Sequence, residues 1–137
     1  MATKKADTRY IEGIGRRKTA SARVRITPAD KTTITVNGKD VKDYFAHQAY
    51  LNRINEVLET PEAGVEHYDI SVHVHGSGLA AQADAIRLGV ARALVKEKAE
   101  RRTVLKKEGY LMRDQRSVER KKFGLRKARK RPAWSKR

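Results

Sequence analysis

Residues 68–94 read YDISVHVHGSGLAAQADAIRLGVARAL, and their apolar periodicity changes partway through. In the first part every second residue is apolar, as in a half-buried strand: Tyr68, Ile70, Val72 and Val74. After the turn-forming residues 76–78, apolar residues recur every three or four positions, as on one face of a helix: Leu79, Ala83, Ile86, Val90 and Leu94. The stretch therefore predicts a strand, a turn with Ser77 as candidate N-cap, and a helix.

Further strands are predicted on the N-terminal side of this unit. The segments at 22–27 and 32–36 alternate apolar and polar residues, and 9–14 is a candidate first strand. The Asn37-Gly38 pair marks a turn after the third segment. These strands and the strand at 68–74 predict a small sheet.

Two more helices are predicted around the same sheet. Asp40 is a good N-cap, and apolar residues at mainly helical spacing continue from there until Thr60, just before a proline. A shorter basic helix over 102–108 ends at Gly109, a natural helix terminator. Leu111 is the last residue expected to contact the core. The sequence therefore predicts a two-layer α+β domain over 9–111, preceded by a flexible arm over 1–8.

The charge of the chain is concentrated at its C-terminal end. Among 137 residues, 32 are Lys or Arg and 16 are Asp or Glu, which gives a net charge of +16. Residues 101–137 hold 16 of these cations against 3 acids. Such asymmetry indicates a polyanionic partner, and nucleic acid and an anionic membrane are the two candidates.

Composition also bears on the compartment. The chain has no cysteine, which fits a reducing environment, and its first ten residues contain no secretory signal. It contains no run approaching the roughly 18 apolar residues that span a bilayer. We expect a soluble cytoplasmic protein.

The segment 112–137 is predicted to be an extended basic tail. Residues 120–137 contain ten Lys or Arg and no acid, so this segment cannot bury enough apolar surface to order itself. We expect RNA to order it, because neutralised phosphates release counterions, and Phe123 and Trp134 can stack on bases. Alternatives are a solubilising tail, a nuclear-localisation patch at 127–131, or a membrane-surface helix, which Pro132 disfavours.

A second basic cluster lies in GIGRRKTASARVRI (13–26). Arg16, Arg17 and Lys18 follow two glycines and are expected at the tip of a hairpin between two strands. Three cations at such a tip favour a phosphate clamp over a solvated turn.

The turn in HGSGLAA (75–81) matches the dinucleotide fingerprint G-x-G-x-x-A only weakly. The fingerprint requires an acidic residue ending a following strand, whereas Glu97 and Glu100 fall in a helical stretch. The alternative is a plain strand-to-helix turn, whose outward N–H groups could hold an RNA phosphate. His73 and His75 are expected on the surface. Because no catalytic pair or metal ligand set is present, we expect no enzyme activity, no cofactor and no small-molecule substrate.

Several motifs resemble one family. GRRKTA (15–20), RDQRSVERKKFG (113–124) and the closing SKR (135–137), together with 36–45 and 75–94, resemble bacterial small-subunit ribosomal protein nine from Gly13 onward. The resemblance implies a fold like domain two of small-subunit ribosomal protein five. It also implies a structural protein in the head of the small ribosomal subunit. Its partners would be ribosomal RNA, neighbouring head proteins and peptidyl-site tRNA, with no membrane.

The resemblance also assigns the basic residues. It implies tRNA contact through the end of the tail: Ser135, Lys136 and Arg137. With the basic clusters above, it implies ribosomal RNA contact through Arg16, Arg17, Lys18, Arg23, Arg113, Arg116, Arg120, Lys121, Lys122, Arg126, Lys127, Arg129, Lys130 and Arg131. Departures from the family pattern are Ser77, Ala80, Ala81, Asp84, Glu108 and the run 132–134. Asp84 is expected to repel phosphate. A histone-like DNA-packaging protein and a membrane-surface adaptor are the alternative classes.

Overall fold

A computed structural model of the chain describes residues 9–61, 64 and 66–136. The arm predicted over 1–8 and the predicted tRNA contact Arg137 lie outside the described residues. The elements are β1 (Ile11–Arg17), β2 (Ala20–Pro28), β3 (Thr33–Val36), β4 (Lys39–Asp40), α1 (Val41–Tyr44), α2 (Gln48–Leu58), β5 (Tyr68–His75), α3 (Leu79–Glu97) and α4 (Arg101–Lys107). No helix in the described part of the chain is long and apolar enough to cross a membrane.

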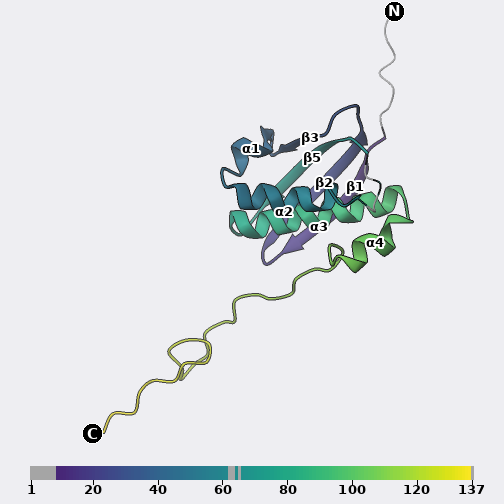
Figure 1. Cartoon of the computed structure of the whole chain (residues 1–137). Helices are drawn as coiled ribbons and strands as arrows, with labels where there is room; N and C mark the ends of the chain where they lie inside the picture. Colours follow the sequence, from purple (N-terminus) through teal and green to yellow (C-terminus); the bar gives the residue numbers. More distant parts are fainter. Residues whose placement is uncertain (1–8, 62–63, 65, 137) are drawn as a thin grey trace, which may run out of the picture.

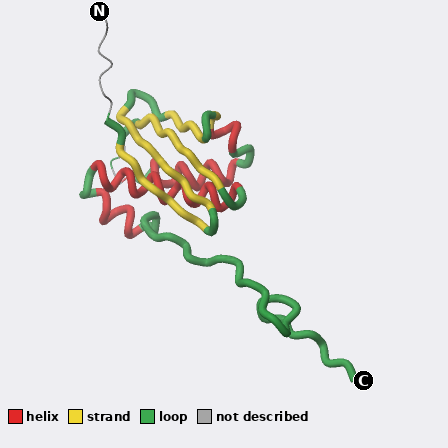
Figure 2. The backbone as a smooth tube through the Cα atoms, turned by 180° about the vertical axis from the view of Figure 1, so that it is seen from behind, coloured by secondary structure: helices red, strands yellow, loops and turns green. Residues whose placement is uncertain are grey.

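The five strands form one mixed sheet in the order β1-β2-β5-β3-β4. All neighbouring strands are antiparallel except β3 and β5, which run parallel. Helices α2 and α3 cover one face of the sheet (Figure 1), and the view from behind shows the opposite face uncovered (Figure 2). This arrangement confirms the predicted two-layer α+β fold.

The core lies between the sheet and the two long helices. The alternating residues of the central strands β2 and β5 are buried on the helix side: Ala20, Ala22, Val24, Ile26, Tyr68, Ile70, Val72 and Val74. From α3 the buried stripe is Ala83, Ile86, Val90 and Leu94. Burying one Val, Leu or Ile side chain stabilises the fold by about 1.5–3 kcal/mol. The strand and helix periodicities predicted from the sequence therefore produce this core.

Strand β1 packs on α3 with almost no space between the two backbones. A Cβ atom added to Gly15 would lie 1.7 Å from the carbonyl oxygen of Ala85, and one added to Gly13 would lie 2.2 Å from that of Gly89. No side chain fits at such distances. These glycines therefore let the edge strand sit directly against the helix.

The single helix predicted after Asp40 is wrong. Asp40 does cap α1, because its Oδ1 accepts a hydrogen bond from the Lys42 N–H at 2.9 Å. The helix then ends at Phe45, which is extended (φ −105°, ψ 92°) and completely buried. α2 begins afresh after His47, whose Nδ1 accepts from the Ala49 N–H. Because a continuous helix cannot also turn Phe45 into the core, the helix is interrupted there.

The start of α3 also differs from the prediction. Ser77 has φ +51°, and Gly78 is the N-cap without any side-chain cap. Leu79 is 44% exposed and does not belong to the core stripe. Side chains in a helix lean toward its N-terminus, so a residue in the first turn reaches beyond the helix that it begins. The prediction of Ser77 as the N-cap was therefore wrong, and so was the prediction of Leu79 as a core residue.

A buried polar cluster joins β5, α3 and α4. Arg101 is 3% exposed, and its guanidinium lies 2.6 Å from the Glu97 carboxylate and donates to the Gly64 carbonyl at 3.1 Å. The Tyr68 hydroxyl donates to the same carboxylate. Burial, and then the bond to Glu97, raises the pKa of Tyr68. The cluster fixes α4, which leads into the C-terminal segment.

Each edge of the sheet has a feature that hinders pairing with a further strand. On β1, Arg92 donates to the outward carbonyl of Ile14 at 2.7 Å, and Lys96 donates to that of Glu12 at 2.7 Å. At the other edge, β4 has only two residues, Lys39 and Asp40, and both are exposed. Neither edge offers a long row of free backbone groups.

Candidate nucleic-acid interface

The tip of the β1–β2 hairpin is smaller than the sequence predicted. Arg16 and Arg17 belong to β1, and the turn begins at Lys18, which has φ +50° and is exposed. Since side chains alternate along a strand, Arg16 lies on the open face of the sheet and Arg17 on the helix side. The three cations therefore do not point into one clamp.

Arg17 is turned toward the C-terminal segment. Its side chain is 13% exposed, and its Nη2 lies 3.2 Å from Asp114 Oδ2. Its Nη1 donates to the carbonyl of Arg116 at 2.7 Å and to that of Asp114 at 3.5 Å. Nε lies 3.7 Å from Oδ2 of Asp84 on α3. Arg17 thus connects β1, α3 and residues 114–116.

Asp84 is neutralised by two arginines. Besides Arg17, its carboxylate contacts Nη1 of Arg53 on α2 at 3.3 Å. The carboxylate that was expected to repel phosphate is thereby part of an ion-pair network inside the protein. Its exposed fraction is 23%, so solvent only partly screens these pairs.

Asp114 holds the beginning of the tail in a fixed turn. It accepts from the backbone N–H of Arg116 at 3.0 Å, and the Arg116 guanidinium lies 3.0 Å from its other oxygen. The bond from the Arg116 side chain, followed by its backbone N–H, lowers the pKa of Asp114 to about 2. Arg116 itself is 86% exposed and can still meet a partner.

A groove lies between the hairpin tip and the tail. It has a volume of about 320 Å³, and its lining residues are Arg17, Lys18, Arg116, Ser117 and Val118. The groove is open to solvent and bordered by cations and one hydroxyl. Its exposed groups, which are the cations Lys18 and Arg116 and the Ser117 hydroxyl, suit a phosphate group.

The open face of the sheet carries a second polar surface. Arg23 stands opposite His73 in the β2–β5 register, and both are exposed. Glu12 contacts Arg23 at 3.4 Å and Arg25 at 3.3 Å, and the Arg25 guanidinium lies 4.5 Å from the centre of the Tyr10 ring. The histidines are on the surface, as predicted. The alternation of Arg23 and Arg25 in the sequence could have indicated Arg25 as well.

Sequence reasoning also missed two cations of α3. Arg92 and Lys96 are exposed at the β1 edge, where they reach across to the backbone of that strand. No sequence motif marks them, because only the packing of α3 on β1 brings them to this edge. They extend the basic surface from the hairpin along the edge of the domain.

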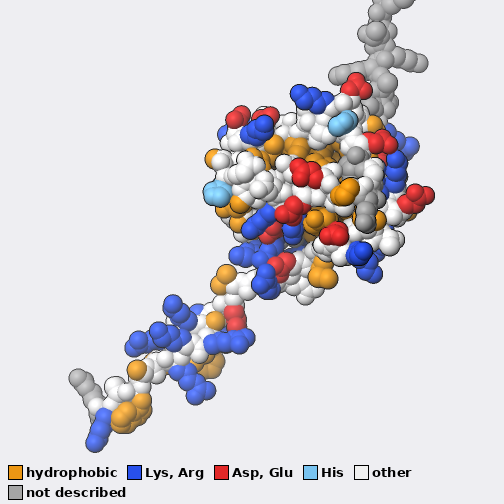
Figure 3. Space-filling model, viewed as in Figure 1, with side chains coloured by type: hydrophobic (Ala, Val, Ile, Leu, Met, Phe, Trp, Pro, Cys, Tyr) orange, Lys and Arg blue, Asp and Glu red, His pale blue; other side chains and the backbone are white. Residues whose placement is uncertain are grey.

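The tail leaves the domain after α4 and runs away from it (Figure 1). Residues 112–136 contain no helix or strand, and the Arg126 N–H donates to the Lys130 carbonyl at 2.8 Å to close one loop. Lys and Arg side chains project along much of this segment (Figure 3). Phe123 is 100% exposed and Trp134 is 84% exposed. The aromatic rings are thus accessible to bases, as base stacking requires.

Few acids accompany these cations. Glu119 contacts Lys122 and lies 2.9 Å from Arg129 Nε, and its pKa is lowered first by the bond from Lys122. The other predicted RNA contacts of the tail lie on the same extended segment: Arg113, Arg120, Lys121, Arg126, Lys127, Lys130 and Arg131. Ser135 and Lys136 are exposed close to its end.

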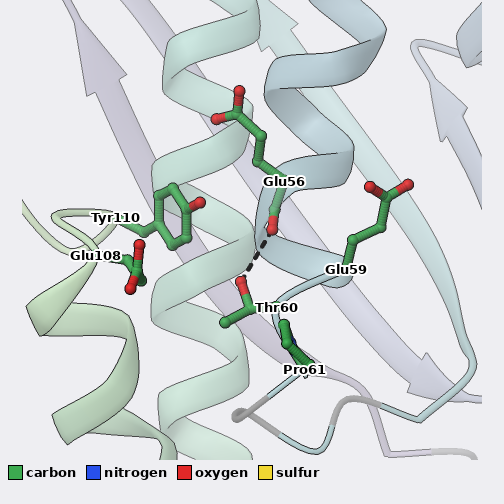
Figure 4. Close-up of a pocket in the computed structure, with 6 residues that line it drawn as sticks. All are labelled: Glu56, Glu59, Thr60, Pro61, Glu108 and Tyr110. Carbon is green, nitrogen blue, oxygen red and sulfur yellow. Dashed lines mark hydrogen bonds between the residues drawn. The ribbon is translucent and has the colours of Figure 1, made fainter.

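A separate pocket of about 360 Å³ lies between the end of α2 and the residues that follow α4. Glu56, Glu59 and Glu108 line it, with carboxylates that point in different directions (Figure 4). The acidic lining would repel phosphate. Among the described residues, no group of three His, Cys, Asp or Glu could hold a metal ion.

Comparisons with known proteins point to one family. A family model described as "Ribosomal protein S9/S16" matches residues 15–137. "Small ribosomal subunit protein uS9" of Gloeothece citriformis (strain PCC 7424) is 54% identical over 139 residues, covering 100% of this chain and 99% of the relative. The protein of that name from Synechocystis sp. (strain ATCC 27184 / PCC 6803 / Kazusa) is 54% identical over 127 residues, covering 91% and 90%.

Proposed function

The chain belongs to the ribosomal protein S9/S16 family, and on this basis we propose that it binds small-subunit ribosomal RNA through its hairpin, its β1 edge and its tail. Membership makes it a structural constituent of the small ribosomal subunit, bound to the ribosome in the cytoplasm, rather than an enzyme. Neighbouring proteins of the subunit are its further partners. The finer proposal concerns which surface meets which RNA.

The exposed charge of the tail carries the proposal. Ten Lys or Arg between 120 and 137 stand against no acid, and the described part of this segment has no helix or strand. Each phosphate that they neutralise releases condensed counterions, which drives binding most strongly at low salt. Exposed Phe123 and Trp134 add base stacking, which is worth about 1–3 kcal/mol for each base. RNA therefore supplies the order that the tail cannot make by itself.

The domain contributes a smaller and more rigid contact. Arg16, Lys18 and Arg23 are exposed around the hairpin and the open face, and Arg92 and Lys96 continue this surface. These side chains project from strands, from the tight turn at Lys18 and from a helix rather than from the tail. They suit phosphates of a folded RNA, which they would contact without reading its sequence.

The end of the tail is proposed to reach the peptidyl-site tRNA. The support is the resemblance of the closing SKR (135–137) to the family motif, together with the exposure of Ser135 and Lys136. Two terminal cations would stabilise the bound tRNA electrostatically, because its phosphates are fixed on the subunit.

A truncation tests the RNA proposal. Removing 112–137 deletes 12 of the 32 Lys and Arg residues, and we expect the affinity for small-subunit ribosomal RNA to fall by about 10³-fold at 100 mM salt. The slope of log affinity against log salt should become shallower at the same time. Filter binding between 50 and 200 mM salt measures both. A variant with Lys106→Gln and Lys107→Gln, on exposed α4 positions, is the control and should change the affinity only slightly.

Deleting only 135–137 separates the two RNA partners. We expect the affinity for ribosomal RNA to change little, whereas tRNA dissociates faster from the peptidyl site of reconstituted subunits. Equal dissociation rates for the intact and shortened chains would contradict the tRNA contact. Equal affinity of the full chain for duplex DNA and ribosomal RNA would favour a packaging protein instead.

A further inference from the structure

We propose that Arg17 and Asp84 anchor the first residues of the tail and so set the direction in which the tail leaves the domain. Arg17 is then a positioning residue rather than an RNA ligand. The anchor is a property of the protein alone. Its consequence for tRNA rests on the proposed function.

The guanidinium of Arg17 already contacts other groups of the protein. Its two Nη atoms contact a carboxylate oxygen and two carbonyls of residues 114–116, and its Nε faces Asp84. The planar fork of arginine can make these contacts together, whereas a lysine ammonium cannot. With 13% of the side chain exposed, a phosphate would have to displace existing partners to bind there.

Asp84 sets the orientation of this fork. It is a half-buried residue of the 19-residue helix α3 and also contacts Arg53 on α2. By pairing with Nε of Arg17, it leaves both Nη groups directed at the tail. The anchor therefore ties the tail to the two helices that cover the sheet.

The anchor extends the fixed part of the chain beyond its apolar contacts. Tyr110 and Leu111 are the last residues packed against the core. Residues 112–114 then run beside Arg17 and α3, and together they line a small cavity of about 40 Å³. The Asp114–Arg116 turn continues the fixed path to residue 116.

The direction at this point decides where the tip of the tail lies. Residues 117–137, if extended, span about 70 Å. A change of 10° at residue 116 therefore moves the tip by about 12 Å, which is more than the reach of a side chain. Beyond residue 116 the described part of the tail has no helix or strand that would restore the direction.

Spin labelling tests the anchor directly, since the chain has no cysteine of its own. One label is placed at Val118→Cys, just beyond the anchor, and the other at Ser71→Cys, on the open face of the sheet; both positions are exposed. Electron–electron dipolar spectroscopy on the full chain gives the distribution of distances. We expect one narrow distribution for the parent and at least a twofold broader one for Arg17→Gln.

The control removes the same charge one residue away. Arg16→Gln lies on the open face and should leave the distribution narrow while lowering RNA affinity. Asp84→Asn should broaden the distribution part of the way, and Arg17→Lys should fall between the parent and Arg17→Gln. The last two variants also serve if Arg17→Gln does not fold, which its thermal midpoint would show.

The functional readout separates positioning from binding. We expect Arg17→Gln to keep most of the affinity for ribosomal RNA yet to speed tRNA dissociation, as the 135–137 deletion does. An unchanged distance distribution in Arg17→Gln and Asp84→Asn would overturn the anchor. A distribution that broadens in a chain that does not bind RNA would leave the anchor standing and contradict the proposed function.

Discussion

The domain over 9–111 and the tail over 112–136 differ in what surrounds their side chains. In the domain, apolar side chains are buried between sheet and helices, and even its buried arginine, Arg101, has a carboxylate partner in Glu97. In the tail, the large apolar side chains Phe123 and Trp134 are exposed, and cations far outnumber acids. The apolar and charged side chains of the domain thus find their contacts within the domain. We expect those of the tail to find theirs on RNA bases and phosphates.

The change from apolar packing to polar contacts takes place over a few residues. Tyr110 and Leu111 still pack against the core, whereas from residue 112 the fixed contacts are ionic and centre on Arg17. Burial is nearly insensitive to salt, whereas the ion pair between Arg17 and Asp114, which is 36% exposed, is partly screened by salt. The two regions should therefore respond differently to the same perturbation.

The largest difference is expected from one substitution made in both regions. Gly15→Ala places a methyl group where the carbonyl oxygen of Ala85 already lies, so β1 must separate from α3. We expect the free energy of unfolding to fall by more than about 4 kcal/mol. Urea unfolding followed by circular dichroism measures it.

Gly124→Ala is the matched change in the tail. A Cβ atom there meets nothing within 4 Å, although an alanine held at a φ of +75° would strain the local backbone. The free energy of unfolding of the domain should stay the same. A loss similar to that of Gly15→Ala would mean that the tail is packed as the domain is.

A smaller effect is expected from removing one carboxylate in each region. Glu97→Gln removes the carboxylate that lies 2.6 Å from the buried Arg101 guanidinium, and we expect a loss of about 3 kcal/mol in the free energy of unfolding. Glu119→Gln removes a carboxylate that also contacts two cations but in solvent, and stability should not change. Thermal unfolding of both variants at one pH makes the comparison. Equal midpoints for the two variants would contradict it.

The smallest effect is a titration at the boundary. The pKa of Asp114 is about 2 instead of its ordinary 3.8, chiefly because the Arg116 side chain bonds to the carboxylate. Since the pKa is lowered, the bonds to Asp114 are complete above about pH 4 and are lost as the pH falls toward 2. Carbon NMR of the Asp114 carboxyl group should show this midpoint, and Arg116→Gln should raise it. A midpoint near 3.8 in the parent would indicate that the turn does not form.

The sequence predicted the elements whose pattern is local. The alternation in β2 and β5 and the stripe of α3 were visible because each follows from a period of two or of three to four residues. The break at Phe45 was not visible, because only the position of the core requires that side chain to turn inward. The close contact of Gly15 with α3 likewise depends on how the two elements pack.

The candidate interface was predicted less completely. Arg16, Lys18 and Arg23 are exposed as an RNA surface requires, and their contact with RNA stays a prediction. Arg17 has the same residue type and is the next residue in the sequence, yet its partners in the tail lie about 100 residues away along the chain. Spacing alone could not distinguish Arg17 from Arg16, because strand alternation separates them only once the helix side of β1 is known.

The edges of the sheet bear on the life of the protein before it joins a subunit. A free strand edge can recruit another copy of the same chain and start a polymer. Here Arg92 and Lys96 bond two carbonyls of β1, those of Ile14 and Glu12, and the last strand at the other edge is two charged residues long. We expect these contacts to disfavour strand pairing between newly made copies.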